Sequence, residues 1–322
     1  MAEKMSEVYE MYDIQIEKTG RGRGAILLYT DKGLLQVRPE TMREERLRTE
    51  YNLKEQLVAC GFTRIDRLVE NREQLLLTYD RYGNPFAIRT YYEGRELNVC
   101  NETEILQAVS NLVSLHKAGR EILQYIDGDI LIRSRNNMRR RNQEMKRVFQ
   151  FISKQSPRRE FEDLYLKAFP YFYEQGLACE KAERPFDLQE YSGYCHGNYT
   201  HHSVLLCEGG ALSTVGFDKA HIGNQLDDLY YFLRKTVEKN GYSFSLYGKM
   251  IESYRASIPL SEDALQYLCH RYAYPEKFYK LSNQYINGTK NWISPKMLEK
   301  LKRIQEEEEK KQILLQAMKK FG

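Results

Sequence analysis

The stretch from Tyr194 to Asp218 contains the residues of this chain that are best suited to catalysis by type and spacing. This stretch, YCHGNYTHHSVLLCEGGALSTVGFD, predicts a short His-Gly loop, a strand over Ser203–Cys207, a turn at Gly209-Gly210 and a second strand ending at Phe217-Asp218. Its order matches a hairpin that serves phosphoryl transfer. In such a hairpin one loop Asp accepts the proton of the attacking hydroxyl, and an Asn and a second Asp hold the metal ions on the phosphates.

Three positions of this hairpin carry other residue types. Asn198 stands at the position of the proton acceptor, Ser203 at that of the metal-binding Asn, and Gly216 at that of the metal-binding Asp. An Asn side chain does not accept a proton as a carboxylate does, and general-base catalysis contributes about 10²–10⁴-fold. Gly216 offers no side-chain oxygen to Mg²⁺, which prefers hard oxygen ligands. We therefore assign no catalytic residue, and the candidate metal ligands are the Ser203 hydroxyl and the Asp218 carboxylate.

Histidines and cysteines also cluster in this stretch, which raises the alternative of a zinc site. Their spacing matches no standard zinc finger, and the first histidine is better explained as a residue that fixes the backbone of the loop. A zinc site is therefore not expected here. The residues concerned are Cys195, His196, His201, His202 and Cys207.

The residues before the hairpin predict a small antiparallel β lobe with one inserted helix. Apolar residues alternate in the strands and recur with helical spacing between Thr41 and Cys60. After Gly94 the pattern becomes helical, so we place a lobe boundary near residue 97, which divides the chain into 1–97 and 98–322. The strands are expected over 13–18, 24–30, 33–38, 63–71, 74–80 and 86–94.

Three residues of the small lobe are candidates for nucleotide binding. Arg38 ends the third strand, where a kinase would place the Lys that holds phosphates. The glycine-rich turn over 19–24 could also cover phosphates, although a flexible hairpin is the commoner explanation of such glycines. Glu50 lies on the inward face of the predicted helix, where it could pair with Arg38 or with Lys54 one turn later. Glu93 lies in the link between the lobes, where adenine would bond to backbone groups.

The rest of the chain predicts helices on both sides of the hairpin. Asn101 and Glu104 have the spacing of a capping box, and His116 on the buried face of this helix is expected to be a core histidine. A basic segment over 133–147 could meet phosphates or an acidic partner, although a solvated helix face is the commoner explanation. Helices are expected from 101, from 133 to about 155, and over 158–182, 225–238, 243–257, 261–271 and 294–321.

Composition limits the class of protein. The 322 residues are 42% hydrophobic and 29% charged, the mean hydropathy is −0.66, and no apolar run of about 18 residues occurs, so we expect no membrane span. The N-terminus lacks an apolar signal segment and the six cysteines lack CxxC spacing, which predicts reduced thiols in the cytoplasm. The net charge of +4 does not indicate nucleic acid as a partner. The 25 tyrosines suit wet interfaces or reflect an ordinary compositional bias.

Several segments of the chain resemble the CotS-type spore coat proteins of endospore-forming bacteria. They are the small lobe, HGNYTHHSVLL, TVGFDKA, QLDDLYYFLRKTVEKNGY and FYKLSNQYINGTKNWIS, so the resemblance covers nearly the whole chain. The parts over 227–240 and 278–294 are the more specific, because generic kinases do not share them. That family is similar in fold to aminoglycoside and choline kinases. The resemblance therefore implies an α+β, bilobal protein-kinase-like fold, with a small antiparallel β lobe with one helix and a larger, mainly helical lobe.

The motifs of these kinases carry over residue by residue. The pattern HGDxxxxN falls on 196–203, where His196 and Gly197 are kept and the Asp and Asn are replaced. The pattern with the metal-binding Asp falls on 215–218, where the first Asp is lost and a later acidic residue remains. Asp228 matches the structural Asp of the following helix. The resemblance thus implies a structural role in the loop for His196, Gly197 and Asp228.

The resemblance also implies a protein made in the mother-cell cytoplasm and assembled onto the spore coat, with other coat proteins as partners. We expect a structural or assembly role on a degenerate kinase-like (pseudokinase) scaffold without efficient phosphoryl transfer. The alternative is an ATP-dependent small-molecule phosphotransferase of the aminoglycoside or choline kinase type with a divergent site. The first function requires no cofactor, although ATP and Mg²⁺ could still bind.

Overall fold

The computed structural model describes residues 5–22, 24–125, 137–288 and 295–320. The chain forms two units that alternate along the sequence, 1–132 with 191–232 and 133–190 with 233–322. These units are not the lobes expected on either side of residue 97, and that boundary stays a prediction. Each unit is described by itself below.

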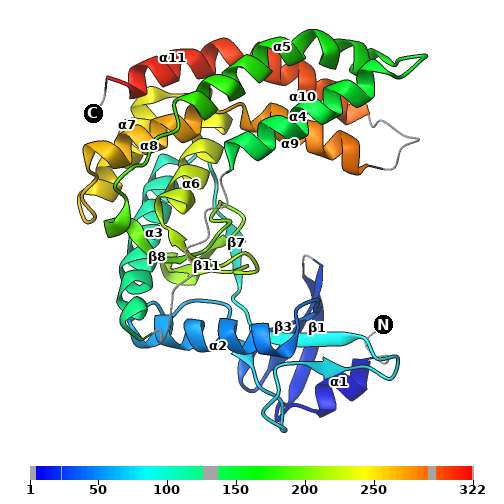
Figure 1. The fold of residues 1–322 in the computed structure, drawn as a ribbon. Helices are drawn as coiled ribbons and strands as arrows, with labels where there is room; N and C mark the ends of the chain where they lie inside the picture. Colours follow the sequence, from blue (N-terminus) through cyan, green and yellow to red (C-terminus); the bar gives the residue numbers. More distant parts are fainter. Residues whose placement is uncertain (1–4, 23, 126–136, 289–294, 321–322) are drawn as a thin grey trace. The chain divides into compact units, whose positions relative to one another are not determined.

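The first unit contains a six-stranded antiparallel sheet (Figure 1). β1 (Ile16–Gly22), β2 (Ala25–Thr30) and β3 (Gly33–Pro39) pair in order, and β6 (Pro85–Thr90) lies beside β3. This confirms the strands expected over 24–30 and 33–38, whereas the first strand, expected over 13–18, begins at Ile16 and continues through most of the glycine-rich segment to Gly22. β4 (Leu68–Val69) and β5 (Thr78–Tyr79) both pair with β6 and are much shorter than expected.

Where these two strands were expected to be longer, side chains replace the backbone hydrogen bonds between strands. The Asn71 carboxamide oxygen accepts the backbone amides of Glu73 and Leu75 at 2.9 and 3.0 Å. The Glu44 carboxylate accepts those of Leu76 and Leu77, each at 2.9 Å. Backbone donors satisfied by side chains do not form strand pairs, so the regular strands end early.

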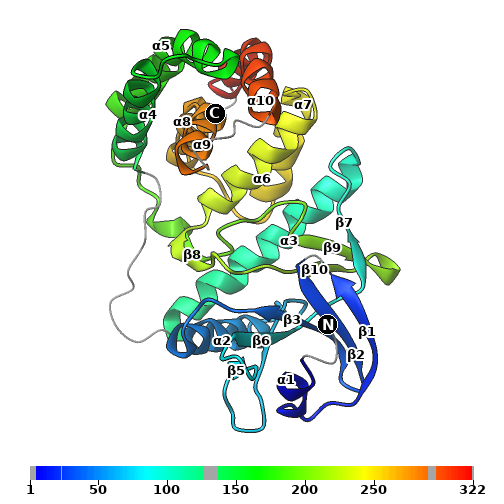
Figure 2. The same ribbon diagram turned by 90° about the vertical axis from the view of Figure 1, so that its right-hand side faces the viewer.

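Two helices cover opposite faces of this sheet, as the alternation of neighbouring β6 residues shows. α2 (Glu44–Ala59) packs Leu47 in one core cluster with Ala87, while Ile88 belongs to the cluster on the other face. There α1 (Ser6–Glu10), which the sequence did not predict, buries Val8. Figure 2 shows both helices beside the sheet. A five-residue helix in a polar N-terminus carries too little periodicity to be recognised.

The remaining part of the first unit surrounds the hairpin. α3 (Glu102–Glu121) begins as predicted, since the Asn101 side chain accepts the Glu104 amide. β9 (Val204–Cys207) and β10 (Leu212–Thr214) form the expected hairpin, to which β7 (Gly94–Glu96) adds a third strand. β8 (Ser192–Cys195) pairs with β11 (His221–Asn224). The second hairpin strand also ends earlier than expected, because Gly216 has a φ of +82° and turns the chain away.

The second unit is helical. The helices expected over 158–182, 243–257 and 261–271 are present, and the helix expected from 133 to about 155 begins at Met138. Residues 133–136 of that segment lie outside the described residues. The helix expected over 294–321 is broken at Glu307, whose carboxylate bonds Lys277 at 2.8 Å. The helices are α4 (Met138–Ser153), α5 (Glu160–Lys181), α7 (Phe244–Arg255), α8 (Glu262–Ala273), α9 (Glu276–Asn287), α10 (Pro295–Glu306) and α11 (Glu308–Met318), and α6 (Leu226–Lys239) starts in the first unit.

Aromatic side chains form the core of the second unit. Phe278 of α9 stacks between Tyr165 and Phe172 of α5, with ring centroids 4.9 and 4.6 Å apart. The Tyr165 hydroxyl is buried and hydrogen-bonds the Ser282 hydroxyl at 2.7 Å. Such pairs stabilise the packing beyond their buried area. No helix was expected over the segment of α9, and its contacts with α5 make it a core helix.

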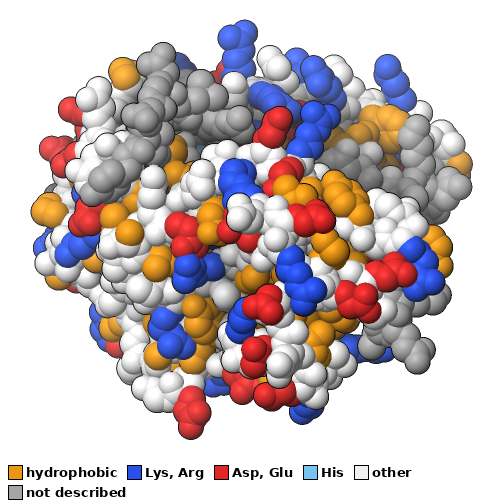
Figure 3. Space-filling view, turned by 90° about the horizontal axis from the view of Figure 1, so that it is seen from below, with side chains coloured by type: hydrophobic (Ala, Val, Ile, Leu, Met, Phe, Trp, Pro, Cys, Tyr) orange, Lys and Arg blue, Asp and Glu red, His pale blue; other side chains and the backbone are white. Residues whose placement is uncertain are grey.

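The surface carries charges of both signs. On the face shown in Figure 3, acidic and basic side chains are interspersed, and hydrophobic side chains form small groups between them. No helix among the described residues is both long enough and apolar enough to span a bilayer.

The acid stability of the second unit should depend on the Glu276 carboxylate. Burial by itself raises its pKa, but Arg141 at 2.6 Å and Lys280 at 3.1 Å outweigh burial and lower the pKa from 4.5 to about 2. A group with a lowered folded pKa contributes stability above its unfolded pKa and loses it as pH falls. We therefore expect about 3 kcal/mol to be lost between pH 5 and pH 2. Urea unfolding at several pH values should show a weaker acid dependence for Glu276→Gln.

The control is Glu309→Gln, because Glu309 is an exposed carboxylate of the same unit. This variant should keep the pH dependence of the unchanged protein. The same acid dependence in both variants would contradict the role of Glu276.

Candidate functional site

The loop that follows β8 is held by one buried carboxylate. Asp228, at the start of α6, accepts the backbone amide of His196 at 2.6 Å and that of Gly197 at 2.8 Å. Burial raises its pKa, but hydrogen bonding and charge from His116, and the Gly197 amide, lower it overall. His116 is buried, and its Nε2 lies 3.8 Å from the Asp228 carboxylate. The carboxylate therefore fixes the backbone at the start of the loop.

The side chains of this loop point into the first unit. The His196 ring Nε2 lies 3.1 Å from the Val215 carbonyl oxygen, and burial lowers the pKa of this imidazole. The Tyr199 hydroxyl donates to the Ala108 carbonyl of α3 at 2.8 Å. The Asn111 side chain of α3 in turn donates to the Tyr199 hydroxyl at 2.9 Å. The loop is thus anchored to α3 and to the end of the hairpin by polar contacts of buried groups.

The hydroxyl of Ser203 is used inside the loop. It accepts the Thr200 amide at 2.8 Å and donates to the Thr200 carbonyl, also at 2.8 Å. Ser203 is buried, whereas Asn198 is exposed. The oxygen at the predicted metal position is therefore engaged with the backbone of its own loop.

Gly216 lies at the second predicted metal position. Its backbone amide donates to the Asp66 carboxylate at 2.8 Å, and its φ of +82° disfavours other residue types. Asp66 is buried and was not among the predicted site residues. Its only signal in the sequence is an acidic residue flanked by Ile65 in a predicted strand.

Arg38 and Asp218 form a bidentate ion pair. One pair of atoms is in close contact, and the second, Nη1 to Oδ2, is 3.5 Å apart. The side chains are 24% and 48% exposed, so solvent screens their attraction. The structure thus brings together the cation predicted for phosphate and the carboxylate predicted for the metal, and each neutralises the other.

Glu50 pairs with Lys54 and not with Arg38. The Lys54 ammonium lies 2.7 Å from Glu50 and 2.8 Å from Asp66, and it also donates to the Asp66 carbonyl at 2.7 Å. Of the two alternatives, the pair one turn apart is the one that forms, and Lys54 is fully buried. Arg89 extends this buried network, 3.8 Å from Glu50 and 2.8 Å from the Glu40 carboxylate.

Glu93 is exposed, and its carboxylate accepts a hydrogen bond from the Tyr29 hydroxyl, which raises the pKa of Tyr29. Among the described residues, neither Glu50 nor Glu93 is hydrogen-bonded or ion-paired to Arg38 or Asp218. The candidates for nucleotide binding therefore fall into separate groups of contacts.

Comparison with known proteins assigns this chain to a family. Residues 5–318 match the family described as "Spore coat putative kinase YutH". The chain belongs to this family. The expected relation to spore coat proteins with a kinase-like fold is therefore confirmed over almost the whole chain. Among curated proteins no match was found.

Solved structures show the same fold at low sequence identity. An aminoglycoside phosphotransferase from Alicyclobacillus acidocaldarius is 13% identical with a TM-score of 0.79, covering 97% of this chain and 94% of its own. The spectinomycin phosphotransferase APH(9)-Ia in complex with ADP and spectinomycin is 14% identical with a TM-score of 0.66, covering 95% and 93%. The choline kinase LicA from Streptococcus pneumoniae is 14% identical with a TM-score of 0.52, covering 95% and 96%. The predicted bilobal, kinase-like α+β fold is confirmed, and this chain is a spore coat kinase-like protein.

The close approach at Gly197 should make this position intolerant of any side chain. A Cβ there would lie 2.1 Å from the Lys219 carbonyl oxygen, whereas at Gly209 a Cβ would meet nothing within 4 Å. Both residues have positive φ, 76° and 70°. Gly209→Ala should therefore cost about 1–2 kcal/mol of unfolding free energy for its conformation. Gly197→Ala should cost about 2 kcal/mol more for the overlap, measured by urea unfolding. Equal losses in the two variants would contradict the close packing of the loop.

The buried cation of Lys54 should be essential for stability. Lys54→Met leaves Glu50 and Asp66 without their closest cation, and breaking a buried ion pair costs about 3–5 kcal/mol. Thermal and urea unfolding should show this loss. The control is Lys32→Met, which removes the exposed pair with Asp13 and should change the stability little. A similar small effect of both substitutions would show that the buried network does not depend on this cation.

Proposed function

We propose that this chain is a structural or assembly protein of the spore coat that uses the kinase-like scaffold without efficient phosphoryl transfer. One observation carries the proposal: no side-chain carboxylate stands at either the proton-accepting or the metal-binding positions of the hairpin. Asn198 is an amide, the Ser203 hydroxyl is bonded within its loop, and Gly216 has no side chain.

The expected effects of these replacements on rate and on metal binding are large enough to carry the proposal. Replacing a general base costs about 10²–10⁴-fold in rate, and Mg²⁺ needs several hard oxygen ligands in near-octahedral geometry. The Arg38–Asp218 pair alone would not prevent nucleotide binding, because a partly exposed ion pair contributes little stability and could open. The missing ligands, and not this pair, therefore argue against catalysis.

The proposed role requires surfaces that bind other coat proteins. Several exposed large apolar side chains lie in one segment of the sheet lobe, Leu75 at 42%, Tyr79 at 58% and Tyr82 at 70% exposure. Tyrosines suit wet interfaces because an apolar ring and a polar hydroxyl contribute together. We propose that the chain is made in the mother-cell cytoplasm and joins the coat through protein contacts of this kind, with no cofactor required.

A second candidate is an ATP-dependent small-molecule phosphotransferase. It is favoured by one observation, the Asp218 carboxylate, which remains in the hairpin and is 48% exposed. If the ion pair opened, Asp218 could hold Mg²⁺ and Arg38 could hold phosphate. Related folds include a spectinomycin phosphotransferase solved with ADP.

Titration with ATP in the presence and absence of Mg²⁺ separates the two functions. We expect calorimetry to show no tight Mg²⁺-dependent binding of ATP, because the hairpin lacks two metal ligands. Tight Mg²⁺-dependent binding that is lost in Asp218→Ala would contradict the proposal and favour the phosphotransferase.

A repair experiment tests the same site from the other direction. Asn198→Asp combined with Gly216→Asp restores two carboxylates, but Arg38 and Ser203 are unchanged and the backbone at Gly216 disfavours a side chain. We expect no efficient ATPase from this variant, provided that thermal unfolding shows it to be folded. Efficient ATP hydrolysis by this variant would show that the other residues around the hairpin support phosphoryl transfer.

A further inference from the structure

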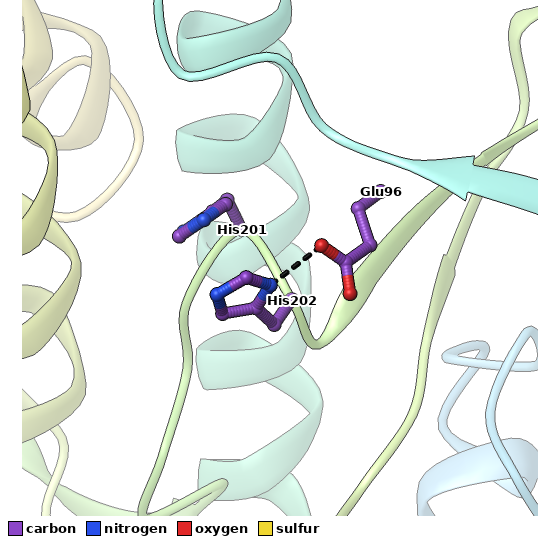
Figure 4. A group of neighbouring side chains, drawn as sticks. All are labelled: Glu96, His201 and His202. Carbon is purple, nitrogen blue, oxygen red and sulfur yellow. Dashed lines mark hydrogen bonds and ion pairs between the residues drawn. The ribbon is translucent and has the colours of Figure 1, made fainter. Parts of the chain in front are cut away.

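We propose that Glu96, His201 and His202 form a binding site for a divalent transition metal ion, with Zn²⁺ the ion that suits the donors best. One ligand atom from each residue can be chosen so that all lie within 4.8 Å of one another. Figure 4 shows the three side chains gathered between the end of β7 and the loop before β9. This site lies outside the proposed function and does not depend on it.

The donor set selects the class of metal. Imidazole nitrogens suit Zn²⁺, Cu²⁺, Ni²⁺ and Fe²⁺, whereas Mg²⁺ and Ca²⁺ prefer sites made of oxygen. Two histidines and one glutamate occur together in zinc sites that keep a fourth position for water. Zn²⁺ bonds of about 2.0–2.2 Å place tetrahedral ligands roughly 3.3–3.6 Å apart. Small side-chain rotations would bring the three groups to that spacing.

The backbone already holds the three residues in place. β7 pairs with β9, so that Glu96 lies opposite Leu205, and only Ser203 separates the two histidines from the start of β9. The His202 backbone amide donates to the Thr200 hydroxyl at 3.3 Å, within the loop that Ser203 closes. A metal ion would therefore bind a preformed group of ligands and would pay little ordering entropy.

One side chain of the cluster is buried and held in place, and the other two are open to solvent. His202 Nδ1 lies 2.5 Å from the Glu96 carboxylate, and the two rings of His201 and His202 have centroids 3.8 Å apart. His201 is 8% exposed, while the side chains of His202 and Glu96 are 47% and 40% exposed. The buried imidazole fixes one donor, and the two exposed groups leave an entry path and room for water. The neighbouring cation Arg95 is paired with Glu104 at 2.7 Å.

This set differs from the zinc alternative considered from the sequence. His196 is bonded to the Val215 carbonyl, and the Cys207 thiol lies 3.4 Å from the Ser213 hydroxyl. The ligand that completes the two remaining histidines is Glu96, which is 105 residues away from His201 in the chain (201 − 96). A bound ion would tie the loop that contains Asn198 to β7.

Zinc titration of the metal-stripped, full-length protein tests the site. Calorimetry should show one Zn²⁺ per chain, Zn²⁺ should raise the melting temperature, and excess Mg²⁺ should do neither. Glu96→Gln and His202→Ala remove exposed ligands, so the fold should persist while the affinity falls at least 10- to 100-fold, the usual effect of losing even an outer-sphere partner. His221→Ala is the matched control, because it removes a histidine of β11 in the same unit, outside the cluster.

Co²⁺ substitution identifies the donors. We expect the visible bands of nitrogen and oxygen coordination, lost in His202→Ala, without the near-ultraviolet band of a cobalt–thiolate bond. A thiolate band would assign the ion to a cysteine and overturn the proposal. The absence of Zn²⁺ binding, or an affinity unchanged by both Glu96→Gln and His202→Ala, would overturn it as well, as would an equal loss in His221→Ala.

Discussion

The hydrogen bonds from the His196 and Gly197 amides to Asp228 are the constraint on which the hairpin depends. They lie in a buried environment, where an unsatisfied amide costs about 1–3 kcal/mol. The bonds orient the loop, and the loop in turn directs the His196 ring to the Val215 carbonyl next to Gly216. None of these contacts uses a group that would take part in phosphoryl transfer. The geometry of a kinase hairpin can therefore persist after the residues of its chemistry have changed.

Charged groups near the hairpin are neutralised by one another. Lys54 lies between Glu50 and Asp66, and Asp66 also receives the Gly216 amide, so one buried carboxylate serves both the ion-pair network and the hairpin. A site for phosphates needs cations that are accessible and can exchange partners. Buried pairs cannot do this cheaply, because separating them leaves an uncompensated charge in a low-dielectric environment. The buried charges of Lys54, Glu50 and Asp66 thus stabilise the structure of the first unit.

Family and fold agree for this chain, and they leave its function to be argued from the residues. It belongs to a spore coat family and shares the fold of enzymes that phosphorylate aminoglycosides and choline. The same fold supports unrelated functions. Here the side chains of the hairpin favour a scaffold, while Glu96 and the two histidines of the same loop offer a separate kind of ligand chemistry.

The features that depend on local sequence pattern could be predicted from the sequence alone. The strands over 24–30 and 33–38, the cap at Asn101, most helices of the second unit and the order of the hairpin follow from periodicity and turn residues, and the structure confirms them. The replaced residue types at 198, 203 and 216 can be read directly from the chain. The short helix α1 was missed because five residues carry too little periodicity, and α9 was missed although its apolar residues recur at helical spacing.

Which distant polar groups meet could be seen only in the tertiary structure. Asp66 reaches Gly216, Arg38 reaches Asp218, and Glu96 reaches His202 across 150, 180 and 106 residues of chain. Such pairs form because strands and loops distant in the sequence converge in space, and a local pattern contains no information about that convergence. For the same reason the sequence shows which residue types stand at 198, 203 and 216, but it could not show that the Ser203 hydroxyl bonds within its loop or that Glu96 lies beside His202.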